Sequence, residues 1–154
     1  TPGYRTVVID GRRRFGTRER FPDVDHLKIG IPSELITDYP LVRSTALVLV
    51  AHDYKYELPV LHYALARDVG YIGMLGSSRR GAAILKLLRE DGVDEASLAR
   101  VRVPIGLDLG AKAAPEIALA VLAEIQAVRG GGTGLPMSQK NRGSNGTSGT
   151  DGRA

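Results

Sequence analysis

The sequence contains no cysteine and no tryptophan, and aromatic residues make up only 5% of its 154 positions. The lack of cysteine excludes a disulfide, a thiolate metal site and a cysteine nucleophile within these residues. No apolar run approaches the roughly 18 residues of a membrane-spanning helix, so we expect no membrane span and a cytoplasmic protein. Hydrophobic residues reach 43% and charged residues 25%. This balance is typical of one soluble globular domain with a sizeable core.

The net charge of +4 does not by itself indicate nucleic-acid binding. Arginines gather in three places: between Arg12 and Arg20, at Arg79 and Arg80, and in the C-terminal tail. No aromatic residues interleave with them, as a base-stacking surface requires. We therefore expect no nucleic-acid partner.

The histidines also argue against a metal centre. His26, His52 and His62 are the only histidines, and their neighbours lack metal-ligand spacing. We expect no protein-bound zinc or iron. We expect His62, beside apolar residues in a helix, to be core or surface filler.

The composition changes sharply near residue 130. Residues 1–129 alternate apolar and polar segments, whereas residues 130–154 are mostly Gly, Ser, Asn and Thr. Such a segment buries too little apolar surface to order itself. We predict a domain over 1–129 and a flexible tail over 130–154.

Strand-like and helix-like segments alternate through the domain. Predicted strands cover 5–10, 26–30, 46–51, 70–75 and 101–107, and predicted helices cover 58–67, 79–91 and 114–129. The run 46–51 is apolar on both faces, so we predict a central buried strand there. Pro59 fits only a first helical turn, and Pro104 disfavours a central strand position. The alternation predicts a Rossmann-like, doubly wound parallel sheet with helices on both faces.

Asp10 ends the first predicted strand and is followed by Gly11 and Arg12. In a dinucleotide-binding fold, an acid at this place binds a ribose hydroxyl, and a Gly-rich turn precedes it by about 20 residues. No G-x-G-x-x-G precedes Asp10 here, so we predict that the first βα unit of the fold is missing from this chain. The alternative for Asp10 is an ordinary strand-end turn.

His52 and Asp53 directly follow the strand predicted over 46–51. Open α/β sheets bind ligands at the carboxyl ends of their strands, so a ligand-facing His52 is the favoured interpretation. The alternative is that Asp53 caps the next helix, with Glu57 in its opening turn.

The loop Gly76-Ser77-Ser78-Arg79-Arg80-Gly81 leaves a strand and opens a helix. Bare backbone N–H groups at a helix start attract anions, and arginines add charge-assisted contacts. The loop therefore predicts an anion site. The alternative is a helix capped by Ser77 or Ser78 with solvated arginines.

A further Gly-rich loop covers 104–111, where Asp108 is the one ionisable side chain. Its glycines either let a ligand approach the backbone or simply make the turn. The role of Asp108 stays open at this level.

These segments together resemble the C-terminal domain of the XdhC/CoxI family, the accessory proteins of xanthine dehydrogenase and related molybdenum hydroxylases. The matching stretches are 7–10 with Arg12, 19–22, 51–53, 71–80, 104–110, 115–118 and 123–125. The resemblance covers roughly residues 3–129. It implies a Rossmann-like domain.

The resemblance implies binding of the molybdenum cofactor (molybdopterin), its protection during sulfuration, and its delivery to a xanthine dehydrogenase-type apo-hydroxylase. It places Asp10, Arg12, His52, Asp53, Gly76, Ser77 and Arg79 at the cofactor, and we add Ser78 and Asp108 as candidates. A cysteine desulfurase and a second copy of the chain are candidate protein partners. Three departures stand out: the absent leading βα unit, Glu57 in place of an aspartate, and Arg80 in place of a lysine.

Nothing in the sequence supplies a nucleophile and base pair or a complete redox site. An oxidoreductase label would then describe the client rather than this chain. Two alternatives stay open: an NAD(P)-dependent oxidoreductase domain, suggested by Asp10 and the fold, and a protein-interaction module without a ligand.

Overall fold

The structure is a computed structural model that describes residues 3–12, 16–50 and 53–140. It divides into two compact units, residues 1–104 and residues 105–154. No helix in the described part of the chain is long and apolar enough to cross a membrane.

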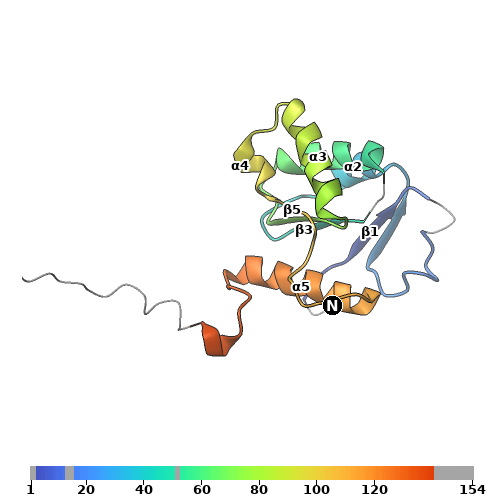
Figure 1. Ribbon diagram of the computed structural model, residues 1–154. Coiled ribbons are helices and arrows are strands. Elements are labelled where there is room, and N and C mark those ends of the chain that lie inside the picture. Colours follow the sequence, from blue (N-terminus) through green and yellow to red (C-terminus); the bar gives the residue numbers. More distant parts are fainter. Residues whose placement is uncertain (1–2, 13–15, 51–52, 141–154) are drawn as a thin grey trace, which may run out of the picture. The chain divides into compact units, whose positions relative to one another are not determined.

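The described residues of the first unit form five strands, which pair in parallel within two sheets (Figure 1). The strands are β1 (Val7–Asp10), β2 (His26–Ile29), β3 (Ala46–Leu49), β4 (Tyr71–Met74) and β5 (Val101–Arg102). β1 pairs with β2, and β3, β4 and β5 form a second sheet in that order. In register, Val7 lies opposite His26, Ala46 opposite Tyr71, and Ile72 opposite Val101.

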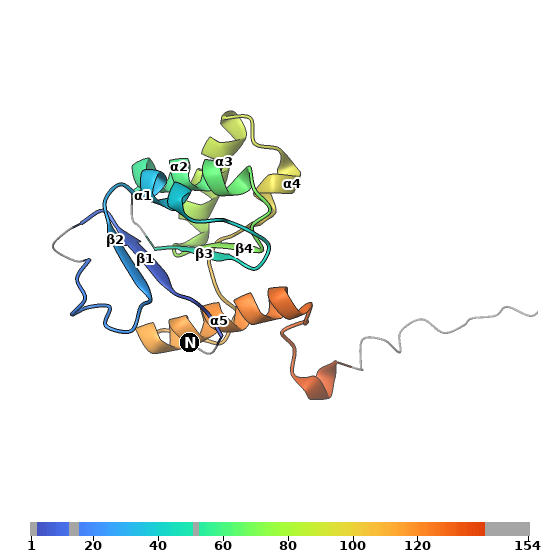
Figure 2. The same cartoon turned by 180° about the vertical axis from the view of Figure 1, so that it is seen from behind.

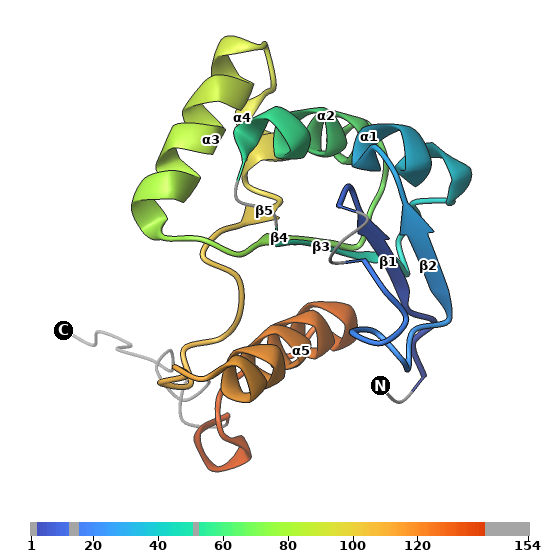
Figure 3. The same cartoon turned by 90° about the vertical axis from the view of Figure 1, so that its right-hand side faces the viewer.

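Helices connect these strands, as a parallel sheet requires. Those of the first unit are α1 (Pro32–Leu35), the 3₁₀ turn η1 (Ile36–Asp38), α2 (Tyr54–Leu65), α3 (Ser78–Glu90) and α4 (Glu95–Leu98). α2 and α3 lie on the same face of the β3–β4–β5 sheet, as Figures 1 and 3 both show. The alternating strands and helices confirm an α/β, Rossmann-like fold.

The core of the first unit lies between this sheet and these helices. It joins strand residues to helix residues, among them Leu49, Ile72, Met74 and Val101 with Val60, Leu61, Ala64, Ile84 and Leu88. Leu61, Ile72, Met74, Ile84 and Leu88 are at most 1% exposed. Full burial of such a side chain stabilises by roughly 1.5–3 kcal/mol. This core holds the starts of α2 and α3 beside the carboxyl ends of β3 and β4.

The second unit contains α5 (Ala114–Gly130) and the 3₁₀ turn η2 (Met137–Gln139). Pro115 lies in the first turn of α5, and Gly131 ends the helix in the left-handed conformation at φ 66°. Both residues suit those positions. Predicted and observed bounds of this helix agree within one residue.

Two predictions about the elements are wrong. The central strand of the three-stranded sheet is β4, not β3, and the Val48 side chain on β3 is 39% exposed. Composition could not show which strand is central, because β3 and β4 are both short and mostly apolar. The order of strands in a sheet depends on pairing between segments distant in the chain. Pro59 lies inside α2 rather than in its first turn, because the helix begins at Tyr54. The short helices α1 and α4 were not predicted, since one turn is too short for periodicity to show.

Candidate functional site

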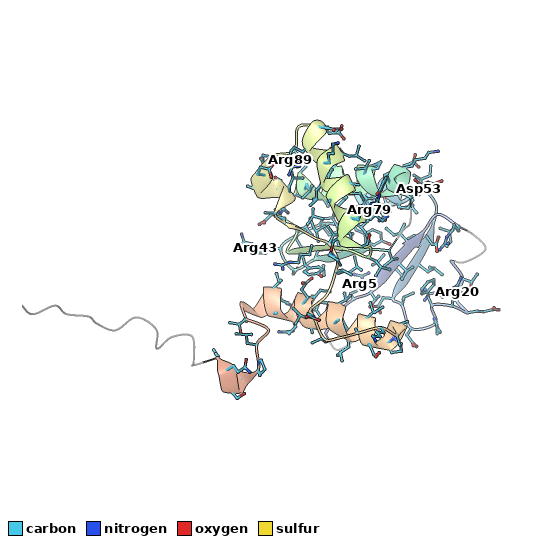
Figure 4. All side chains as sticks on the ribbon, viewed as in Figure 1. Arg5, Arg20, Arg43, Asp53, Arg79 and Arg89 are labelled. Atoms are coloured by element: carbon cyan, nitrogen blue, oxygen red, sulfur yellow. The ribbon has the colours of Figure 1, made fainter. Side chains whose placement is uncertain are left out.

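Two helix starts follow neighbouring strands and share one local design. Asp53 precedes α2 with extended backbone, and its carboxylate accepts a hydrogen bond from the Lys55 N–H at 2.9 Å. Ser77 precedes α3 in the same way, and its Oγ accepts from the Arg80 N–H at 3.1 Å. Both residues are therefore N-caps, which satisfy backbone donors that the helix leaves open. Figure 4 shows Asp53 at the start of α2 and the side chain of Arg79 at the start of α3.

A buried ion pair joins these two helix starts. Nη2 of Arg80 lies 2.8 Å from Oε2 of Glu57, whose side chain is fully buried, while the Arg80 side chain is 19% exposed. The Arg80 guanidinium also lies over the Tyr54 ring, 4.8 Å from its centroid. Nη1 of Arg80 is buried with no hydrogen-bond partner among the described residues. Arg80 is therefore held by α2 on two sides, and its charge is neutralised inside the protein.

The first turn of α3 carries positive charge where a helix favours negative charge. Arg79 and Arg80 both lie there and no acidic residue does. Each of the other described α-helices has an acid in its first turn: Glu34, Glu57, Glu95 and Glu116. Because the helix dipole is positive at this end, two arginines there are unfavourable unless anions compensate them. Glu57 compensates Arg80, whereas the Arg79 side chain is exposed to solvent.

Two glycines shape the backbone at this helix start. Gly76 has a φ of +150°, which side-chain-bearing residues rarely adopt. Gly81 is buried, and a Cβ there would lie 2.6 Å from a methyl carbon of Val103. Gly81 therefore lets α3 pack closely against the segment after β5. Together they hold the Ser77–Arg80 turn at one place beside the sheet.

Asp10 lies at the carboxyl end of β1, where its carboxylate is already engaged. It accepts hydrogen bonds from the Arg12 backbone N–H at 2.9 Å and from Arg12 Nε at 3.2 Å. Partial burial raises the pKa of Asp10, but the hydrogen bonds from Arg12 and the nearby charges of Arg12 and Arg20 outweigh it. The pKa therefore lies below its ordinary value. The strand-end turn considered as an alternative is present, and Arg12 itself is 64% exposed.

The loop after β5 belongs to the second unit from Ile105 onward. Gly106 has a φ of +100°, and a Cβ there would lie 3.2 Å from Cβ of Ala120 on α5. Its N–H donates to Glu124 Oε1 at 3.2 Å. These contacts explain the glycine by close packing against α5. Asp108 is exposed in this unit, and its placement relative to Asp53 or Ser77 is not determined.

The structure thus brings together only part of the predicted site. Asp53, Gly76, Ser77, Ser78 and Arg79 lie at the two helix starts, whereas Asp10 and Arg12 lie at the end of β1. His52 lies outside the described residues.

The other two histidines contact residues in separate parts of the first unit. His62 lies at the surface and pairs with Asp91 at 2.9 Å. His26 contacts Arg5 and lies edge-on to the Tyr39 ring. The described residues hold no group of three or more side chains that could bind a metal ion.

The sequence did not predict the ion pair between Glu57 and Arg80, nor the contact between the Arg80 guanidinium and the Tyr54 ring. One signal was present: opposite charges occupy the first turns of helices that follow consecutive strands. Neighbouring parallel strands place such helices side by side, so a contact between the two charges could have been proposed.

Fold and site together define an α/β domain of the Rossmann class with a basic helix start beside its sheet. Residues 1–125 match the family model described as the XdhC Rossmann domain. The chain belongs to this family. The family membership and the Rossmann-like fold that the resemblance implied are confirmed.

Known proteins similar to this chain carry related names. It is 29% identical over 123 residues to a Bacillus subtilis protein named as a probable xanthine dehydrogenase subunit, covering 80% of this chain and 35% of that protein. It is 40% identical over 85 residues to the molybdenum cofactor insertion chaperone PaoD of Escherichia coli, covering 55% of this chain and 27% of PaoD. Third, the uncharacterized protein YqeB of Escherichia coli is 34% identical over 132 residues, or 86% of this chain and 24% of YqeB. The chain thus spans about a third or less of each relative.

A solved structure shares the fold. The crystal structure described as a xanthine dehydrogenase from Bacillus halodurans superposes with a TM-score of 0.70, covering 87% of this chain and 38% of that one. The two sequences are 24% identical, so this likeness concerns the fold alone.

Proposed function

We propose that this domain binds the molybdenum cofactor and serves in the maturation of a xanthine dehydrogenase-type molybdenum hydroxylase. Membership of the XdhC family supports this role, as does the similarity to a protein named a molybdenum cofactor insertion chaperone. The observation that carries the proposal is the start of α3, where Arg79 is exposed and no acid is present in the first turn.

The chemistry of this helix start suits the phosphate of the cofactor. A phosphate there would receive backbone N–H groups of the first turn and a charge-assisted contact from Arg79. Gly76 leaves the backbone before Ser77 without a side chain. Because no metal-binding cluster occurs in the described residues, the contacts we propose are to the organic part. The molybdenum chemistry itself belongs to the client enzyme that receives the cofactor.

Each candidate residue has a stated task under this proposal. Ser77, Ser78 and Arg79 hold the phosphate, while Asp53, Asp10 and Arg12 contact polar groups of the pterin. His52 and Asp108 are kept as candidates for the same ligand. We further propose that the domain protects the cofactor during sulfuration. In this proposal a cysteine desulfurase supplies the sulfur, and the apo-hydroxylase receives the cofactor.

A second candidate is NAD(P) binding, favoured by the place of Asp10 at the carboxyl end of β1. Acids at this place accept ribose hydroxyls in dinucleotide-binding folds. Here Arg12 already donates three hydrogen bonds to the carboxylate. Titration with NAD and NADP beside molybdopterin separates the two proposals, and a chain that binds none of them would be an interaction module.

The test of the phosphate contact is Arg79→Ala, measured by titration with molybdopterin. Loss of one charge-assisted hydrogen bond weakens binding by about 1.5–3 kcal/mol, or roughly tenfold to over a hundredfold. The stability of the variant should stay within about 0.5 kcal/mol of the parent, because the side chain is exposed. Lys86→Ala, another exposed cation on α3, is the matched control and should bind normally. Unchanged affinity in both Arg79→Ala and Arg79→Ala/Arg80→Ala would remove this loop from the site.

A further inference from the structure

The buried ion pair between Glu57 and Arg80 joins two helices that lie side by side. α2 and α3 are neighbours in both Figure 1 and Figure 2. Glu57 lies in the first turn of α2 and Arg80 in the first turn of α3, so the pair spans the two helix starts. The start of α3 carries the phosphate contact of the proposed function. The charge of this ion pair therefore bears on that contact.

The Arg80 side chain lies against the backbone that leads into α3. A Cβ at Gly76 would lie 3.4 Å from Cδ of Arg80 and 3.6 Å from its Nη1. Gly76 directly precedes Ser77, the N-cap of α3, and the Arg80 N–H donates to the Ser77 Oγ. The Arg80 charge thus lies at the same helix turn as Arg79. Without a counter-charge it would attract an anion bound at that turn.

Two residues of α2 hold this charge inside the protein. Oε2 of Glu57 accepts a hydrogen bond from Nη2 of Arg80 at 2.8 Å, and the Tyr54 ring lies 4.8 Å from the guanidinium. Nη1 of Arg80 is buried as well. α2 therefore supplies both the counter-charge and the surface that keeps most of the guanidinium away from solvent.

Stability alone does not account for a charged pair at this place. Taking two charges out of water is costly, and buried ion pairs can often be replaced by apolar side chains without loss of stability. What the pair changes is the charge at the start of α3. With Glu57 present, the exposed Arg79 is the arginine that a ligand meets. Without Glu57, the charge of Arg80 would be added to that of Arg79.

We propose that Glu57 is a positioning residue that lowers the affinity of the α3 start for phosphate. It holds the Arg80 guanidinium against α2 and cancels its charge, so that Arg79 and the backbone N–H groups alone bind the phosphate. This inference rests on the proposed function, because a domain that delivers a cofactor to another protein has to release it. A further charge-assisted contact would tighten binding and slow that release.

The experiment titrates the full chain and its variants with molybdopterin and, separately, with inorganic phosphate. Glu57→Gln keeps the length of the side chain and an acceptor for Arg80, but removes the negative charge. It should bind both probes roughly tenfold more tightly, which corresponds to about 1.4 kcal/mol. A residue that only supported the fold would show the opposite change, because its replacement would loosen the helix start and weaken binding.

Matched variants separate the charge of Glu57 from its packing. Glu57→Asp keeps the negative charge and should not show the tighter binding. Glu57→Leu/Arg80→Met removes Glu57 together with the charge that it cancels, and should not show it either. Lys86→Ala, an exposed cation further along α3, is the control for a general effect of net charge. Thermal denaturation with and without phosphate is the second measurement, and the added phosphate should raise the Tm of Glu57→Gln more than that of the parent.

Equal or weaker binding of both probes by Glu57→Gln would overturn this proposal and leave the Arg79 contact untouched. An equal gain in Glu57→Leu/Arg80→Met would also overturn it, because the Arg80 charge would then not be the cause. A parent chain that binds neither probe would overturn it together with the proposed function. The failure of this proposal and the failure of the proposed function are thus distinguishable.

Discussion

The starts of α2 and α3 are capped in the same way but carry opposite charges in their first turns. Each comes after a parallel strand and is capped by a side chain, Asp53 in one case and Ser77 in the other. The first turn of α2 carries Glu57, in agreement with the helix dipole, whereas the first turn of α3 carries two arginines against it. The comparison shows that Arg80 is compensated by Glu57 from within the protein, whereas Arg79 is exposed to solvent.

The largest loss of stability is expected from breaking the buried ion pair between Glu57 and Arg80. Arg80→Met should lower the free energy of unfolding by about 3–5 kcal/mol, because the fully buried Glu57 carboxylate loses its guanidinium partner. Glu57→Gln should lower it less, since the Arg80 side chain is 19% exposed and can still reach water. Urea denaturation of both variants measures the difference.

The double variant Glu57→Leu/Arg80→Met is the control for that result. Replacing both charges with apolar side chains should recover most of the stability lost in Arg80→Met. Equal losses in both single variants, with no recovery in the double, would mean that the pair does not act as a unit.

A smaller effect is expected from removing either cap. Asp53→Ala and Ser77→Ala should each lower stability by about 0.5–2 kcal/mol, because each leaves a helix N–H without its side-chain acceptor. Thermal denaturation measures both losses, and unchanged stability in either variant would argue against that residue as a helix cap.

The smallest effect is expected at the end of β1, where Asp10 pairs with the exposed Arg12. The pKa of Asp10 is lowered in the folded chain, so its contribution to stability is present above about pH 4, the unfolded value. That contribution is lost as the pH falls through the lower folded value. Asp10→Asn should flatten this part of the pH–stability curve only slightly, because Arg12 is 64% exposed. A curve identical to that of the parent would show that the pair contributes nothing.

Much of the local structure could be predicted because its causes are local. The helix α3 begins and ends within one residue of its predicted bounds, since Ser77 caps it and Gly92 follows it. Ser77 and Asp53 were weighed as caps, and both act as caps. The sequence predicts too late a start for α2, because Pro59 favours a first turn, whereas the helix begins at Tyr54 and continues through Pro59.

The candidate site was predicted less completely. Its loops were found, because ligand sites in open α/β sheets follow the strand ends. The different environments of Arg79 and Arg80 were not predicted, because they depend on Glu57, which lies 23 residues before Arg80 in the chain. The functional roles of the remaining candidate residues stay predictions, as do the domain boundary near residue 129 and the tail.

The sequence by itself determined where the five strands and the three longer helices lie along the chain, which residues could cap α2 and α3, and which family the chain belongs to. These depend on hydrogen bonds and side-chain periodicity within a few residues. Only the tertiary structure decided that β4 pairs on both sides, with β3 and β5, and that Glu57 neutralises Arg80. Each of these depends on which distant segments pair, because strand order and buried charge contacts are set by packing across the whole core.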